Sequence, residues 1–426
     1  MILIHTYHNI KTILSKNRVI RRCVKIFVLF VFVALLAPFI ANDKPLVCKY
    51  KSHWLFPAFS FNNQLAINNK TISYNMGKEW KTLNYNFAIF PPCSYSPNTI
   101  DADNAPRKSP FEKQLMTNAN GESIELPFKF KHWLGTTQNG NDVLACIIHG
   151  TKTSLSVGIF SMLIATFLGI FFGACAGYFQ NNTLKIGYLQ TFFLLISLFI
   201  SYFFCFVIRS EKLSEAFKQG GFELIWQLVF TIYIFIQNAF IFIRLGKWID
   251  KKLNLNTRLN FPVDIIVLRI IEVLNSIPTL LLIIAISAIS KPSYSLLIII
   301  IGFLSWTIIA RLTRAEYLKA KQLDYVTSCK AIGMSHSRII VKHILPNVLP
   351  LIMVQIVFGL AGAVLIEASL SFIGVGVPLN VITWGSLLNE ARDHFSAWWL
   401  VVFPGLCLFT LIFIYNKIAN EISKIK

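Results

Sequence analysis

The sequence lacks the short motifs that mark the common classes of soluble enzyme. It contains no Gly-x-x-x-x-Gly-Lys-Ser/Thr phosphate loop, so we expect no ATP hydrolysis by this chain itself. It also has no Gly-x-Ser-x-Gly, no His-Glu-x-x-His and no paired carboxylate motif. Its eight cysteines form no Cys-x-x-Cys pair and no Cys/His spacing suited to zinc, so we expect no metal ligands. Acidic residues are scarce, with 20 against 40 basic ones.

Apolar residues are abundant and occur in long blocks. They make up 55% of the 426 residues, and 37 residues are Phe. The blocks reach the roughly 20 residues that a helix needs to cross a bilayer. The basic residues lie at the ends of these blocks, as the positive-inside bias produces. The sequence therefore predicts a polytopic membrane protein in contact with the lipid bilayer, and its net charge of +20 does not indicate nucleic-acid binding.

The apolar blocks predict eight membrane spans. They lie at about 26–40, 153–178, 184–208, 222–244, 264–289, 293–312, 348–370 and 397–418. The basic segment 1–25 precedes the first span and favours an uncleaved anchor over a cleaved signal peptide, with a cytoplasmic amino terminus. An even number of spans then places residues 313–347 and the carboxyl terminus in the cytoplasm as well.

Residues 42–150 differ in composition from the rest of the chain. They are polar and rich in Asn, Pro and aromatic residues, and Pro91-Pro92 is one of several turn signals. We expect a mixed extracytoplasmic domain here. Cys48 and Cys93 could form a disulfide in it or remain two free thiols.

Residues 324–347 form a basic island between two apolar blocks, and the island has a helical pattern of its own. Tyr325, Val326, Cys329 and Ile332 fall on one face of a short amphipathic helix. Gly333 suits the residue that ends this helix, and Ser335 can cap a second one that runs to Pro346. An apolar face on a membrane surface indicates docking of a soluble partner, whereas the plainer interpretation is a solvated basic loop.

This island resembles the signature loop of ABC importer permeases, in which a Gly follows a short helix and Ile-Leu-Pro comes about a dozen residues later. The family has Glu-Ala-Ala where this chain has Thr327-Ser328-Cys329. The resemblance implies a cytoplasmic coupling loop at 316–347 that contacts an ATPase subunit. Its expected contact residues are Asp324, Tyr325, Val326, Thr327, Ser328, Cys329, Ala331, Gly333, Ile344, Leu345 and Pro346.

Further segments resemble the dipeptide/oligopeptide branch of the same family. The stretch 132–145 is similar to its Leu-Gly-Thr-Asp-x-x-Gly-Arg-Asp-Val-Leu segment, with Thr137 in place of the Asp and Asn141 in place of the Arg. The stretches 263–279, 367–378 and 383–385 follow in the family's order. The implied fold is an all-α polytopic membrane protein. It comprises a six-helix type I permease core, two inserted helices within 180–262 and a mixed extracytoplasmic domain.

The implied domain order follows the chain. It is a basic N-terminus (1–25), a first helix (26–41), an extracytoplasmic domain (42–150), a second core helix (151–179), the insertion with its cytoplasmic connector (180–262) and the remaining core (263–426).

The resemblance implies a non-catalytic inner-membrane permease subunit that translocates dipeptides or oligopeptides. The implied partners are ABC ATPase subunits that use ATP, a second permease and an extracytoplasmic substrate-binding protein, and no cofactor is expected on this chain. Nickel or another small solute is an alternative cargo. From a different class, an intramembrane enzyme or assembly factor would use Glu272 or Glu367 chemically.

Glu272 and Glu367 are the acidic residues that lie well within predicted spans. Charges within a bilayer are costly and are usually paired or functional. Each glutamate could line a translocation path, pair with Arg269, Arg311 or Arg314, or make a structural hydrogen bond in the helix bundle.

Overall fold

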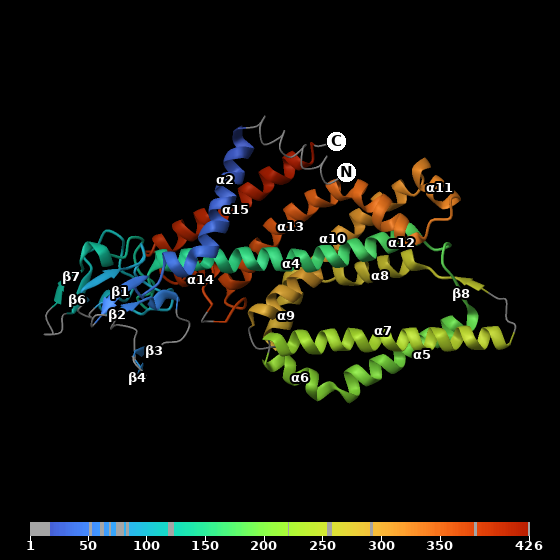
Figure 1. The fold of residues 1–426 in the computed structure, drawn as a ribbon, viewed down its shortest axis with the longest axis horizontal. Helices are drawn as coiled ribbons and strands as arrows, with labels where there is room; N and C mark the ends of the chain where they lie inside the picture. Colours follow the sequence, from blue (N-terminus) through green and yellow to red (C-terminus); the bar gives the residue numbers. More distant parts are fainter. Residues whose placement is uncertain are drawn as a thin grey trace. The chain divides into compact units, whose positions relative to one another are not determined.

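A computed structural model of the chain is composed mainly of helices (Figure 1). It describes residues 18–50, 53–59, 64–67, 70–73, 81, 85–117, 123–219, 221–253, 258–289, 293–378 and 381–424. The long helices are α2 (Arg18–Ile40), α4 (Val143–Phe179), α5 (Tyr188–Tyr202), α7 (Gly221–Lys252), α10 (Tyr294–Ala320), α13 (Leu345–Ile373) and α15 (Trp399–Ile422). The shorter ones are α6 (Ser210–Gln219), α8 (Val263–Asn275), α9 (Thr279–Ile289), α11 (Asp324–Ala331), α12 (His336–Arg338) and α14 (Trp384–Ala391). Two π-helical segments, η4 (Phe203–Ile208) and η5 (Ile339–Ile344), extend α5 and α12.

The predicted eight spans correspond to seven long apolar helices and one bent pair among the described residues. The bent pair is α8 with α9, whose axes differ by 73° across the break at residues 276–278. Pro278 explains the break, since proline removes a helical hydrogen bond and restricts the residue before it. The observed helices thus match the predicted all-α polytopic class.

Short strands lie in the region between α2 and α4. They are β1 (Val47–Tyr50), β2 (His53–Leu55), β3 (Gln64–Ile67), β4 (Lys70–Ser73), β5 (Phe87–Ile89), β6 (Leu115–Thr117) and β7 (Ser123–Glu125). They form a three-stranded sheet in the order β2-β1-β5 and the antiparallel pairs β3-β4 and β6-β7. The mixed character predicted for this region is therefore present. Cys48 and Cys93 are buried free thiols, so they form no disulfide with each other.

Several element boundaries differ from the predicted ones. Helix α4 begins at Val143, so the last residues of the predicted 42–150 domain are helical, because the Asp142 carboxylate accepts from the Ala145 N–H (2.7 Å) and caps the helix. Helix α2 includes basic residues from Arg18 onward, ahead of the predicted start of the first span at about residue 26. The predicted basic segment 1–25 otherwise lies outside the described residues. Helix α10 continues to Ala320, which removes residues 316–320 from the predicted loop.

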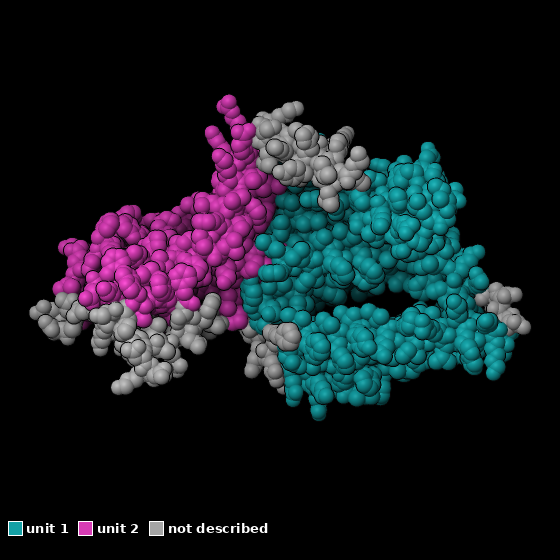
Figure 2. Space-filling view, viewed as in Figure 1, with its two compact units in different colours: residues 1–11, 159–363, 419–426 teal, residues 12–158, 364–418 magenta. Residues whose placement is uncertain are grey.

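The chain divides into two compact units, coloured separately in Figure 2. Unit 1 comprises Met1–Lys11, Ile159–Ala363 and Ala419–Lys426, and unit 2 comprises Thr12–Gly158 and Val364–Ile418. The core of unit 2 gathers the start of α4, α14 and the start of α15. Its buried residues include Val143, Ile147, Leu387, Trp399 and Leu400.

Within unit 1, α5 and α7 pack along each other as a helical hairpin (Figure 1). A two-stranded antiparallel ribbon closes its base, formed by β8 (Lys185–Gly187) and β9 (Arg258–Asn260). These elements correspond to the two predicted inserted spans.

Candidate functional site

The island at 324–347 forms the predicted helix, glycine turn and second helix. Helix α11 ends in two hydrogen bonds, from the Met334 N–H to the Cys329 carbonyl (3.1 Å) and from the Gly333 N–H to the Lys330 carbonyl (3.0 Å). This pattern is a Schellman turn, and Gly333 supplies the left-handed residue that it requires, with φ of 80°. Ser335 stands at the predicted N-cap of α12, although its side chain makes no capping hydrogen bond.

The exposed face of α11 differs from the predicted one. Val326 and Cys329 are buried within the chain, so they are not available to a partner. Ile332 is 75% exposed and Leu323 is 49% exposed. The apolar surface that α11 offers therefore lies at its two ends, and the small residues Thr327 and Ser328 between them are exposed.

The second helix continues without interruption into the membrane. Helix α12, η5 and α13 form one helical stretch, His336–Ile373, so Pro346 lies inside a helix and does not separate two. A π-helical hydrogen bond from the Leu345 N–H to the Ile340 carbonyl lies just before this proline. The wider π-helical turn accommodates Pro346, which has no backbone N–H to donate. Ile344 is buried, whereas Leu345 and Pro346 are half-buried.

Two tyrosines connect this segment to the neighbouring helices of unit 1. The Tyr178 hydroxyl, at the end of α4, lies 2.9 Å from Nδ1 of His336. The Tyr317 hydroxyl, near the end of α10, donates to the Ile340 carbonyl (3.2 Å). Both tyrosines are fully buried, and the Lys330 ammonium lies 5.7 Å from the centre of the Tyr178 ring. We call Tyr178 and Tyr317 the tyrosine tethers.

Helices α4 and α10 themselves approach closely. A Cβ on Gly173 would lie 2.6 Å from the Ala310 carbonyl, and one on Gly177 would lie 2.6 Å from the Arg314 carbonyl. The glycines are four residues apart and so share one helix face, a spacing that lets membrane helices pack backbone to backbone. The 324–347 segment is thus hydrogen-bonded to a closely packed helix pair.

Glu272 lies on α8, and its surroundings differ from those of the other predicted glutamate. Arg269 donates to the Glu272 carboxylate at 2.7 Å, and 76% and 55% of the two side chains are exposed. Arg314, a predicted alternative partner, instead forms a two-pronged ion pair with Asp264 at the start of α8 (Nη2–Oδ2 2.7 Å).

Glu367 is completely buried in α13 of unit 2. Its carboxylate accepts from the Ser154 hydroxyl of α4 (3.1 Å) and from the Ser371 hydroxyl one turn on (2.8 Å). These contacts have the form of the structural hydrogen bond that was one of the predicted alternatives. The pairing with Arg311 or Arg314 does not occur among the described contacts.

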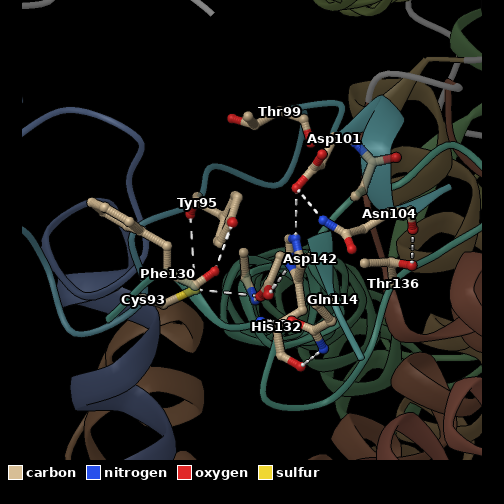
Figure 3. Close-up of polar contacts among 12 residues, drawn as sticks. Cys93, Tyr95, Thr99, Asp101, Asn104, Gln114, Phe130, His132, Thr136 and Asp142 are labelled. Carbon is tan, nitrogen blue, oxygen red and sulfur yellow. Dashed lines mark hydrogen bonds and ion pairs between the residues drawn. The ribbon is translucent and has the colours of Figure 1, made fainter. Parts of the chain in front are cut away.

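A buried polar cluster lies in unit 2, in the segment before α4 (Figure 3). His132 is completely buried, with Nδ1 2.8 Å from Asp142 and Nε2 3.1 Å from Asp101. The Gln114 side chain accepts from the His132 N–H (2.7 Å) and donates to its carbonyl (3.0 Å). The Tyr95 ring stacks on the imidazole with centroids 4.1 Å apart.

The two carboxylates control the ionisation of this cluster. Burial alone lowers the pKa of His132, but hydrogen bonds to Asp101 and Asp142 outweigh it and raise that pKa above the ordinary value. Burial likewise opposes ionisation of Asp101, yet its hydrogen bond from His132 lowers the Asp101 pKa. Nearby, burial lowers the pKa of Lys81 to about 8. Its ammonium lies over the Tyr95 ring, 3.0 Å from the centroid.

The cluster has no counterpart among the predicted site residues. The stretch 132–145 was identified in the sequence by its resemblance to a permease segment, with no partner assigned to His132. This stretch forms a tight turn, with the Thr137 N–H bonded to the Asn141 carbonyl (2.9 Å). The sequence signal for this cluster was a histidine ten residues before a helix-capping aspartate. That spacing alone does not indicate a site, because the fold must also bring Asp101 beside the histidine. Within the described part of the chain, no three His, Cys, Asp or Glu side chains are grouped to hold a metal.

Comparison with known proteins finds similarity to permease proteins of transport systems. Residues 253–422 match the family described as binding-protein-dependent transport system inner membrane component. The chain is 25% identical over 404 residues to the inner membrane ABC transporter permease protein YejE of Escherichia coli, covering 93% of this chain and 90% of that one. It is 27% identical over 291 residues to the dipeptide transport system permease protein DppC of Alkalihalophilus pseudofirmus, covering 68% and 69%. It is 36% identical over 163 residues to a putative peptide transport system permease protein of Brucella suis, covering 38% and 55%.

Proposed function

We propose that this chain, whose residues 253–422 belong to the binding-protein-dependent transport system inner membrane components, is a permease subunit of an ATP-driven importer of dipeptides or oligopeptides. The substrate is proposed from the relatives, two of which are named for dipeptide and peptide transport. The chain would act without catalysis of its own, and partner ATPase subunits would use the ATP.

One observation carries the coupling role proposed for residues 324–347. The Schellman turn at Gly333 joins the short helix α11 to the start of the His336–Ile373 helix, and the tyrosine tethers join that start to α4 and α10. A partner that moves Ile332 and Leu323 would thereby move two spans. We propose the exposed ends of α11 as the contact for the ATPase subunit, with Gly333 as the pivot.

The proposal includes an orientation and a set of partners. The 324–347 segment and both chain termini would lie in the cytoplasm of the cell, with the 42–142 region on the opposite side of the inner membrane. A second, different permease would complete the pathway, and a substrate-binding protein would deliver the solute. Glu272 is proposed as a pathway residue, whereas the hydrogen bonds of Glu367 support a structural role.

The test is co-purification of the tagged chain in mild detergent, with its partners identified by mass spectrometry. Recovery of an ATPase and a second permease is the expected result. Recovery of a stable chain without any ATPase would overturn the proposal. Uptake of labelled tripeptides by vesicles holding the assembled complex then tests the substrate separately from the assembly.

A further inference from the structure

The break between α8 and α9 frees backbone polar groups within a candidate span. Helix α8 ends at Asn275 and α9 begins at Thr279, with a bend of 73° between them. In a bilayer, irregular backbone persists only where it is buried in protein or lines a water-filled cavity. The surroundings of α8 therefore indicate which of these two environments the break has.

One side of α8 is anchored to α10. Asp264 pairs with Arg314 at the start of the helix, and the Asn275 side-chain oxygen accepts from the Thr307 hydroxyl (3.3 Å) at its end. Ile271, between these two contacts, is fully buried. This side of the helix is thus covered by the chain itself.

The other side carries a charged stripe, which we define as Arg269, Glu272 and Ser276. These residues are spaced i, i+3 and i+7 and so share one face. All three residues are exposed. In the Arg269–Glu272 ion pair, 76% of the Arg269 side chain and 55% of the Glu272 side chain are exposed. The exposed ion pair is an observation independent of the helix break.

An ion pair at this position cannot face hydrocarbon at low cost. At 1.5 Å per residue, Glu272 lies about 14 Å along the axis from Val263, in a hydrocarbon core about 30 Å thick. Charged side chains at such depth face a bundle interior or a water-filled cavity. The break and the ion pair therefore both place the charged stripe against water or another polar surface.

We propose that the charged stripe lines the solute pathway and recognises a zwitterionic solute, a small peptide with free amino and carboxyl termini. Glu272 would accept hydrogen bonds from the ammonium group, and Arg269 would bind the carboxylate through its planar guanidinium. Without solute the two side chains satisfy each other. Binding exchanges this pair for two similar contacts, so the solute is held weakly enough to be released, as a pathway requires. This inference rests on the proposed import of peptides.

The first test measures access of water to the stripe. Ser276→Cys is compared with Ile270→Cys, an exposed position about 120° away around the same helix. Both variants are reconstituted as the full complex in vesicles and treated with a charged, membrane-impermeant maleimide, with the unaltered chain as baseline. We expect the Ser276→Cys variant alone to react above baseline and excess tripeptide to slow the reaction. Equal reaction of both variants, or of neither, would overturn the assignment of a water-lined face.

The second test separates recognition from a structural ion pair. Glu272→Gln should raise the tripeptide concentration needed for half-maximal uptake about tenfold, the effect of losing one charge-assisted hydrogen bond, with the amount of assembled complex unchanged. The exchanged double variant, Arg269→Glu with Glu272→Arg, keeps an ion pair but reverses it. We expect it to remain impaired, and full recovery of uptake would show that the pair is only structural. If the unaltered complex takes up no peptide, the proposed function fails, whereas normal uptake by Glu272→Gln defeats this inference alone.

Discussion

At the scale of single residues, His132 is a fully buried polar group of unit 2. It is buried between Asp101 and Asp142, and its protonated form lets both ring nitrogens donate to carboxylates. The cluster joins three parts of the chain that are separated in sequence. Its charge state therefore bears on the stability of the whole segment before α4.

The stability of unit 2 should depend on pH through His132. Its pKa is raised in the folded state, so the stabilisation is complete below about 6.5 and is lost as pH rises through the folded pKa. Thermal unfolding of the detergent-solubilised protein should show a lower Tm at pH 8 than at pH 6. His132→Gln should remove this slope and destabilise the fold by about 3 kcal/mol, because the buried Asp142 and the half-buried Asp101 lose their cation.

Lys81 and Asp101 define the limits of that pH window. The pKa of Lys81 is lowered to about 8 in the folded state. Above that pH the Lys81 contribution makes the folded state more stable as pH rises, which is opposite to the effect of His132. The lowered pKa of Asp101 acts only in acid, where its contribution is lost as pH falls. A pH slope between 6 and 8 that persists unchanged in His132→Gln would contradict the assignment.

Substitution of Gly333 should be unfavourable because of its backbone conformation and not because of a steric clash. Nothing lies within 4 Å of a Cβ placed there, but φ is 80°, and a left-handed L residue costs roughly 1–2 kcal/mol. We expect Gly333→Asp to leave the chain inserted and to abolish uptake. Gly362→Ala is the matched control, since its Cβ also meets open space and its φ is ordinary. Normal uptake by Gly333→Asp would remove the assignment of the pivot.

At the scale of elements, the tyrosine tethers join the 324–347 segment to the spans. The Tyr178 hydroxyl reaches across from α4 to His336, and α4 in turn packs backbone to backbone against α10. A hydrogen bond of this kind contributes about 1 kcal/mol. Its loss alone should therefore leave the fold intact.

Tyr178→Phe should weaken coupling without unfolding the protein. The variant keeps the buried ring and loses only the hydroxyl, so we expect intact assembly and fewer peptides imported per ATP hydrolysed. Tyr188→Phe, an exposed tyrosine on α5, serves as the control and should match the unaltered protein. An unchanged ratio of uptake to ATP hydrolysis in Tyr178→Phe would show that the tether does not transmit motion.

The elements were more predictable from the sequence than their contacts. Gly333 predicted the end of α11, because the left-handed turn is a local requirement of the backbone. The prediction of which face of α11 is exposed was wrong. The buried side of this short helix depends on contact with Tyr178, which is far away in the sequence. The Asp101–His132–Asp142 cluster was missed for the same reason. Pro346 was assigned to a helix boundary, since the π-helical turn that accommodates it has no recognised sequence signal.

At the scale of the whole molecule, the α5–α7 hairpin lies within residues 1–252, which precede the family match at 253–422. The hairpin starts and finishes at one place, because β8 and β9 pair directly, with Gly187 opposite Arg258. Its outward aromatic residues, among them Phe199 and Trp226, suit contact with lipid. It has the form of an addition to a core that continues on either side of it.

Excision of the hairpin should therefore leave the core able to assemble. Residues between Gly187 and Arg258 are replaced by a short Gly-Ser linker, which retains the β8–β9 pairing. We expect the shortened chain to insert and to co-purify with the same partners as the full chain. The linker placed after Gly187 with the hairpin retained is the control. Loss of the partners in the excised chain alone would make the hairpin part of the assembly surface.

The glycine face of α4 has a consequence for the order of events during synthesis. The ribosome completes α4 at Phe179, but α10, which covers Gly173 and Gly177, begins only at Tyr294. The hairpin pairs within itself in the meantime and gives this face no partner. The nascent chain thus carries an uncovered small-residue face through the synthesis of three further spans, α5, α7 and the bent pair α8–α9, and this is the interval in which a membrane insertase has a surface to hold.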